Sequence, residues 1–301
     1  YKTKKIAYPR LMQSYFTNQI RKNPFYCNLS GTGSGKTLSA VLASRIMDCK
    51  VTLVVCPNDI VEQWGGNPEI GKDGDIKDIF PDSIVYTKDD VFTAKLGTTK
   101  HQYLVLNWEK FQIDSIVNKL SKLQKTKIDF IVMDEIQFVK IRGKVAGRRR
   151  KHLEAFINGV KATNPKVKVV GLSATPVINE LSEGRSLLNL VSGGGYDDTN
   201  LKVKANIGNA VALHEKFANI SVREIPDYNI HENRVFVDVD GTWPPGHESR
   251  ELIANPLMTE EILTLIRIPK ILELIDGPTI IYTEYVGSSD DTRSRKIIDI
   301  L

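Results

Sequence analysis

Short apolar runs alternate with longer amphipathic stretches through the first two-thirds of the chain. Several of these runs are continuous in Val, Ile and Leu, which is typical of parallel strands that are covered on both faces. The alternation predicts an α/β fold in which helices flank a parallel sheet, as in a RecA-like P-loop domain. The expected strands are residues 25–29, 51–55, 83–86, 103–106, 130–133 and 167–172, and the expected helices are residues 10–21, 36–47, 59–64 and 108–123.

The pattern changes after residue 192. Residues 192–200 are rich in Gly and polar side chains, and the stretch to about residue 269 shows no clear alternation of strands and helices. A new strand is expected at residues 279–283. We therefore expect three parts: an ATP-binding lobe 1 over residues 1–195, an inter-lobe or accessory segment over 196–269, and the start of lobe 2 over 270–301. A lone strand and helix cannot bury a core, so lobe 2 is expected to be truncated or incomplete.

Composition narrows the class of protein only slightly. The chain is 41% hydrophobic and 26% charged, and its formal charge of +5 permits a polyanionic partner without requiring one. Cys27, Cys49 and Cys56 lack a metal-ligand spacing and are expected to be buried thiols in a reducing compartment. No apolar run approaches the roughly 18 residues that cross a bilayer. These features predict a cytoplasmic protein without a membrane partner.

A glycine-rich loop gives the strongest indication of chemistry. It follows an expected strand and opens an expected helix, where backbone N–H groups turn toward phosphate oxygens and the helix N-terminus favours negative charge. Lys36 would reach the β- and γ-phosphates, and the Thr37 hydroxyl would hold Mg²⁺. Ser30 stands where the strict pattern has Gly. The sequence therefore predicts an ATP and Mg²⁺ site on the loop Gly31, Thr32, Gly33, Ser34, Gly35, Lys36 and Thr37.

Two further motifs follow expected strands. Asp134 and Glu135 end the apolar run at residues 130–133, and parallel strands bring their carboxyl ends to one edge of the sheet. Asp134 would hold the metal through the metal's water shell, while Glu135 would orient the attacking water. The segment Ser173, Ala174 and Thr175 follows the last expected strand, and its hydroxyls suit a coupling element that changes partners when the γ-phosphate leaves.

These three motifs, in this order, resemble those of the superfamily II helicases and translocases, which have two RecA-like lobes. The resemblance implies that Gln137 joins the catalytic residues and that the amide of Gln13 pairs with adenine, with Gln19 as a competing candidate. Residues 51–64, which end in Gln63-Trp64, and residues 172–196 are similar to the Swi/Snf-like branch. Two departures are Ser-Ala-Thr in the third motif and Ile-Gln at the end of the second, and the later second-lobe motifs do not appear.

The same resemblance implies contacts with nucleic acid. Phosphate-backbone contacts are expected after the second and fourth strands, at Pro57, Asn58, Asn107 and Trp108. Residues 140–151 are expected to form a basic loop, in which Arg148, Arg149 and Arg150 either track DNA phosphates or are simply solvated. Sequence specificity would then come from further domains or subunits.

The favoured function is an ATP-dependent translocase that moves along double-stranded DNA, for example in a restriction or defence system. A strand-separating helicase and a nucleic-acid-binding module that does not hydrolyse ATP remain as alternatives. An ABC-type ATPase is excluded because Ser192-Gly193-Gly194 follows Asp134 instead of shortly preceding it. A small-molecule kinase shares the phosphate loop but would not need the Gln63-Trp64 segment.

Overall fold

A computed structural model describes residues 8–139, 147–177, 179–227, 270 and 272–273. The chain divides into two compact units, Tyr1–Tyr228 and Asn229–Leu301, and nearly all of the described residues belong to the first. This first unit is built on a seven-stranded sheet of order β3-β4-β2-β5-β6-β1-β7 in which every pair is parallel. The strands are β1 Phe25–Asn28, β2 Val51–Cys56, β3 Ile84–Thr87, β4 Gln102–Asn107, β5 Phe130–Asp134, β6 Lys168–Leu172 and β7 Ser221–Val222.

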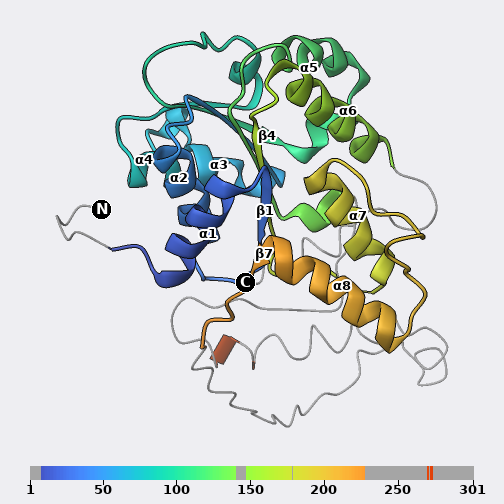
Figure 1. Cartoon of the computed structure of the whole chain (residues 1–301). Coiled ribbons are helices and arrows are strands. Elements are labelled where there is room, and N and C mark those ends of the chain that lie inside the picture. Colours follow the sequence, from blue (N-terminus) through green and yellow to red (C-terminus); the bar gives the residue numbers. More distant parts are fainter. Residues whose placement is uncertain (1–7, 140–146, 178, 228–269, 271, 274–301) are drawn as a thin grey trace, which may run out of the picture. The chain divides into compact units, whose positions relative to one another are not determined.

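Two layers of helices cover the sheet (Figure 1). The helices are α1 Leu11–Lys22, α2 Lys36–Ile46, α3 Val61–Gly65, α4 Asp75–Ile79, α5 Val117–Leu123, α6 Arg148–Thr163, α7 Leu181–Ser192 and α8 Ile207–Ile220. The first four share one apolar core with one face of the sheet, and α5, α6 and α7 share a second core with the other face. The two cores together bury β2 and β5 along their whole lengths, as is typical of parallel strands that are covered on both faces.

The α/β fold predicted from the sequence is confirmed, and each of the six expected strands is present. The three cysteines are free and buried. The expected helix over residues 108–123 is wrong. Short 3-10 turns at Trp108–Gln112 and Asp114–Ile116 precede α5, and the extended backbone of Ile113 separates the two turns. Trp108 and Phe111 are both fully buried, so the packing of these side chains in the core determines the path of the first turn.

Two stretches hold more regular structure than the sequence predicted. Arg148, Arg149 and Arg150 open helix α6 and do not lie in a loop. Helix α8 and strand β7 fall within the expected inter-lobe segment, and β7 pairs with β1 at the edge of the sheet. The expected strand at residues 279–283 lies outside the described residues. In the part of the chain that is described, no helix is long and apolar enough to cross a membrane.

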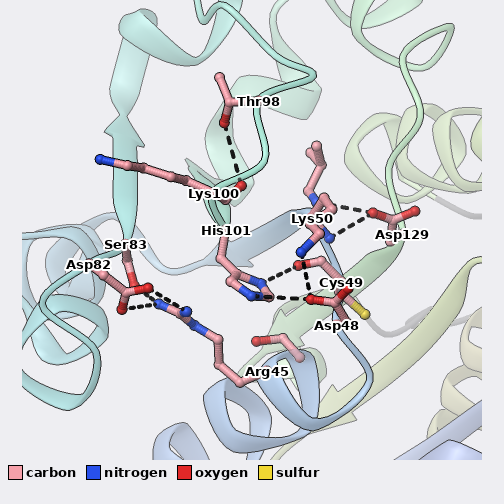
Figure 2. A network of polar contacts seen from close by, with 12 residues as sticks. Arg45, Asp48, Cys49, Lys50, Asp82, Ser83, Thr98, Lys100, His101 and Asp129 are labelled. Atoms are coloured by element: carbon pink, nitrogen blue, oxygen red, sulfur yellow. Dashed lines mark hydrogen bonds and ion pairs between the residues drawn. The ribbon is translucent and has the colours of Figure 1, made fainter.

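A polar network joins the amino ends of the strands (Figure 2). The Asp129 carboxylate accepts hydrogen bonds from the backbone N–H groups of Lys50 and Val51, at 2.9 and 3.1 Å. Nδ1 of His101 donates to the carbonyl of Cys49 at 2.8 Å. Arg45 forms a two-point ion pair with Asp82. These contacts fix the edge of the sheet opposite the predicted site, which lies at the carboxyl ends of the strands.

Candidate active site

The predicted phosphate loop connects β1 to α2. Gly33 and Gly35 have φ angles of 70° and 82°, a left-handed conformation that favours glycine. The Lys36 ammonium donates to the carbonyls of Ser30 and Gly31, at 3.0 and 3.1 Å. Burial lowers the pKa of Lys36, while the nearby charges of Glu135 and Asp134 raise it. The loop's own backbone therefore holds the lysine, with the charges of Asp134 and Glu135 nearby.

Gln13 lies against this loop. Its side chain is buried, and a Cβ on Gly35 would come within 2.5 Å of its amide nitrogen. The Gln13 Oε1 atom accepts a hydrogen bond from the backbone N–H of Arg10 at 2.8 Å. The side chain of Gln19, the competing candidate, instead contacts Asn23. The structure thus brings Gln13 to the loop, and adenine recognition stays a prediction.

Asp134 ends strand β5 as a buried carboxylate whose two oxygens each accept a hydrogen bond. The indole N–H of Trp64 donates to Oδ2 at 2.8 Å, and the backbone N–H of Glu135 donates to Oδ1 at 3.0 Å. Burial raises the pKa of Asp134 to about 6, against the lowering effect of the Trp64 hydrogen bond. Each carboxylate oxygen has a second lone pair, so the group keeps acceptor capacity for the water shell of a metal ion.

The raised pKa of Asp134 predicts a pH-dependent contribution to stability. The folded protein binds a proton here more tightly than the unfolded chain, so the stabilising contribution is present at low pH and is lost as pH rises through about 6. The free energy of unfolding of the wild type, minus that of Asp134→Asn, should fall by about 2 kcal/mol between pH 4 and pH 7. Urea titrations without metal or nucleotide measure this difference, and a value that does not change with pH would contradict the raised pKa.

A line of hydrogen bonds connects the acidic pair to the segment after β6. Gln137 donates from Nε2 to the Glu135 carboxylate at 2.6 Å, and the Ser173 hydroxyl donates to Oε1 of Gln137 at 2.7 Å. The backbone N–H of Thr175 then donates to the Ser173 hydroxyl at 3.0 Å. Ala174 lies between these partners and is half-buried. The predicted catalytic and coupling residues are therefore brought together.

The metal and nucleotide that the sequence predicts fit these residues. Mg²⁺ binds in proteins through one or two carboxylates together with substrate phosphates, and it keeps several waters. Asp134 would supply the carboxylate, and Thr37 lies in the first turn of α2, directly after Lys36. Within the described residues, no cluster of three or more His, Cys, Asp or Glu side chains is present.

Ser30 and Glu224 are two residues near the loop whose role the sequence did not predict. The backbone N–H of Glu224 donates to the buried Ser30 hydroxyl at 2.9 Å, and Gly31 donates its N–H to the Glu224 carbonyl at 2.8 Å. Ser30 is the position that departs from the strict loop pattern, so this departure was the available signal. Nothing in the sequence pairs it with a residue 194 positions away. The chain that leaves β7 is therefore tied to the start of the phosphate loop.

This contact predicts that Ser30→Ala destabilises the protein by about 1 kcal/mol, because the partly buried N–H of Glu224 loses its acceptor. Ser34→Ala is the matched control in the same loop. The Ser34 hydroxyl is buried and has no hydrogen-bond partner among the described residues. Its removal leaves no partner unsatisfied, so Ser34→Ala should be neutral or slightly stabilising. If Ser30→Ala changed the free energy of urea unfolding no more than Ser34→Ala does, the Ser30 contact would contribute nothing.

The predicted nucleic-acid residues differ in exposure. The Asn107 side chain donates to the exposed Asn58 at 3.1 Å, so the segments after β2 and β4 are in contact. Pro57 and Trp108 are buried as whole residues, so the structure does not expose these two predicted contacts to a ligand. Trp108 instead donates from Nε1 to the carbonyl of Asp134 at 3.1 Å.

The three arginines of the basic run also differ in burial. Arg148 is exposed and pairs with Asp114 at 3.0 Å, and Arg149 lies 3.7 Å from a Glu109 oxygen. Arg150 is buried, and its guanidinium donates to Val139, to Glu154 and to Ser186. A role for Arg150 in tracking phosphates is therefore wrong, because its donors are used inside the protein. Residues 140–146 lie outside the described residues.

Known proteins provide the remaining evidence. A solved structure of a Sulfolobus solfataricus SWI2/SNF2 ATPase core in complex with dsDNA is similar in fold, with a TM-score of 0.51 and 16% identity over 71% of this chain and 42% of that chain. A DUF1998 helicase MrfA bound to DNA and AMPPNP matches with a TM-score of 0.42 and 18% identity, over 61% and 26% of the two chains. The chain thus spans less than half the length of either structure. No curated protein matches the chain.

The family comparison covers the part of the chain that contains the site. The profile of the family described as type III restriction enzyme, res subunit, matches residues 6–178. This range holds the phosphate loop, the acidic pair and the Ser173 segment, and it is more than half of the 301 residues. The chain therefore belongs to the type III restriction enzyme res-subunit family, among the superfamily II helicase-like proteins, and has a RecA-like fold.

Proposed function

We propose that this chain is the ATP-binding part of a motor that hydrolyses ATP and moves along double-stranded DNA. The observation that carries the proposal is the line of hydrogen bonds from Glu135 through Gln137 to Ser173. It begins at the acidic pair that faces the phosphate loop and ends on the segment that leads into α7. Loss of the γ-phosphate on hydrolysis would break or re-form these hydrogen bonds. The segment that leads into α7 would then change its position with the bound nucleotide.

The catalytic roles follow from position. Lys36 would bind the β- and γ-phosphates, and Thr37 and Asp134 would hold a magnesium ion, which would supply positive charge to the phosphate oxygens. Glu135 orients the attacking water, and Gln137 fixes the Glu135 carboxylate. Gln13 would read the adenine. The loop residues Gly31, Thr32, Gly33, Ser34 and Gly35 present their backbone to the phosphates.

Nucleic acid would bind at the segments that follow β2 and β4. The Asn58–Asn107 hydrogen bond joins these segments, and Arg148 and Arg149 add exposed or half-exposed positive charge. The fold is similar to that of a SWI2/SNF2 core solved with double-stranded DNA, which favours duplex over single-stranded nucleic acid. Contacts to the phosphate backbone carry no sequence information, so specificity would come from further domains or subunits.

The expected lobe 1 over residues 1–195 extends further, because α8 and β7 belong to the same compact unit and β7 pairs with β1. We assign residues 1–228 to lobe 1, the rest of the expected segment 196–269 to an inter-lobe segment, and residues 270–301 to the start of a second RecA-like lobe. The family match favours an ATP-dependent restriction system in the cytoplasm. A strand-separating helicase and a binding module that does not hydrolyse ATP are the competing functions.

A triplex-displacement assay separates these functions. A labelled third strand is annealed to a long duplex, and the full-length protein is added with ATP, with ADP, or with ATP and Glu135→Gln. A duplex translocase should displace the third strand only with ATP and wild-type protein, and it should leave a forked duplex intact. Opening of the fork would favour the helicase, and no displacement by a protein that binds the duplex would favour the binding module.

A further inference from the structure

The side chain of Asp134, the proposed metal-binding acid, is hydrogen-bonded to a buried tryptophan. Trp64 is 1% exposed, and its indole N–H donates to Oδ2 of Asp134 at 2.8 Å. This hydrogen bond is charge-assisted and lies in a buried site, so it is strong and directional. With the backbone N–H of Glu135 on Oδ1, it fixes the plane of the carboxylate.

Tight packing fixes Trp64 itself. It lies in α3, which has only five residues and would not be stable alone. A Cβ on Gly65 would come within 2.3 Å of the Thr87 side chain in β3, and one on Gly74 would come within 2.7 Å of the Trp64 carbonyl. The backbone at Gly65 and Gly74 therefore lies too close to its neighbours for any side chain larger than that of glycine. This packing holds the backbone of Trp64 in place.

Trp64 also connects the acid to the surface. The turn Asn58–Ile60 leads directly into α3, so a movement of Asn58 would be carried by a short, packed segment to the indole. Asn107 binds Asn58, and the next residue, Trp108, donates to the backbone carbonyl of Asp134 at 3.1 Å. Both segments that we expect to contact nucleic acid thus carry a buried tryptophan whose N–H reaches the same acid.

We propose that Trp64 is a positioning residue for magnesium: its indole N–H sets the orientation in which Asp134 receives the ion and carries the position of the segment after β2 to that ion. The proposal rests on the proposed function, because it takes Asp134 as the metal-binding acid. Trp108 contacts only the backbone of Asp134, so the same chemical change at Trp108 leaves the carboxylate oriented.

The test compares nucleotide binding with and without magnesium. Calorimetry measures the affinity of the full-length wild type, Trp64→Phe and Trp108→Phe for a non-hydrolysable ATP analogue, in Mg²⁺ or in EDTA. Trp64→Phe should weaken binding in Mg²⁺ by about 10- to 100-fold, the range seen when a partner of a metal ligand is lost, and should leave binding in EDTA within about twofold. Trp108→Phe should keep the wild-type ratio of the two affinities.

The outcomes separate the two claims. A wild-type protein that binds the analogue equally well in Mg²⁺ and EDTA would overturn the metal role of Asp134 and this inference with it. A wild type that prefers Mg²⁺, with Trp64→Phe retaining that preference, would overturn the inference alone. Equal loss in Mg²⁺ and in EDTA would mean that Trp64 merely supports the fold.

A measurement on the wild type covers the case in which Trp64→Phe does not fold. The sequence has three tryptophans, so Trp108→Phe and Trp243→Phe assign the indole ¹⁵N–¹H signal of Trp64 by elimination. This signal should move more when the analogue binds with Mg²⁺ than when it binds in EDTA, and it should move again when duplex DNA is added. An unchanged signal on DNA addition would overturn the link to the surface, and equal shifts in Mg²⁺ and EDTA would overturn the link to the metal.

Discussion

Glu135→Gln is expected to slow ATP hydrolysis by about 100- to 10,000-fold, the range for loss of a positioned acid or base, while nucleotide binding persists. Glu135 holds a left-handed backbone conformation with φ 50°, and Gln137 donates to its carboxylate at 2.6 Å. Such a conformation costs free energy in a residue other than glycine, and it is maintained here by the surrounding contacts. The glutamine keeps the shape of the side chain but cannot accept a proton from water.

Steady-state hydrolysis and equilibrium binding of a fluorescent nucleotide measure the two halves of this prediction. Glu62→Gln is the matched control, since Glu62 makes the same type of polar contacts, with Asn67 and Lys88, away from the phosphate loop. It should hydrolyse ATP at the wild-type rate. Near-normal turnover by Glu135→Gln would remove this carboxylate from the catalytic step.

Arg150→Met is expected to lower the free energy of unfolding by about 3 kcal/mol, because removing one partner of a buried polar network leaves the others unsatisfied. The Arg150 side chain donates to the carbonyls of Val139 and Ser186 at 3.2 and 2.8 Å. It therefore ties the turn after the acidic pair to helix α7. Methionine replaces most of the volume, so the change isolates the lost hydrogen bonds.

Arg148→Met is the control two positions away. Arg148 is exposed, and its partner Asp114 is exposed as well, so this variant should lose less than about 1 kcal/mol. For binding to a DNA duplex, the two variants should have the opposite order of effects. Arg148→Met should weaken binding more than folded Arg150→Met does. If Arg150→Met unfolds at the same urea concentration as the wild type, the buried network does not stabilise the lobe.

The sequence was most informative where one physical requirement determines the residue types. Strands β2 and β5 are mainly apolar because both of their faces are covered, so their bounds were predicted closely. The phosphate loop needs glycines with positive φ next to a lysine, and Gly33, Gly35 and Lys36 meet that need locally. Local constraints of this kind are visible in the chain before it folds.

The contacts that the sequence could not predict depend on the order of strands in space. Trp64 reaches Asp134 across 70 positions because β2 and β5 are neighbours in the sheet. Arg150 stands within a run of basic residues that favours a solvated loop, and only its tertiary contacts with Val139 and Ser186 reveal that it is buried. Helix α8 was missed because it follows a stretch rich in Gly and polar residues, and Leu213 is the one residue of this helix that is buried.

We expect nucleic acid to stimulate ATP hydrolysis at this site. The direct measurement is the rate of hydrolysis by the full-length protein with no nucleic acid, duplex DNA, single-stranded DNA or RNA, alongside Glu135→Gln. Duplex DNA should stimulate the wild type most, and Glu135→Gln should stay strongly impaired in every condition. A rate that is the same with and without every nucleic acid would contradict the motor and leave a P-loop nucleotide hydrolase of another kind.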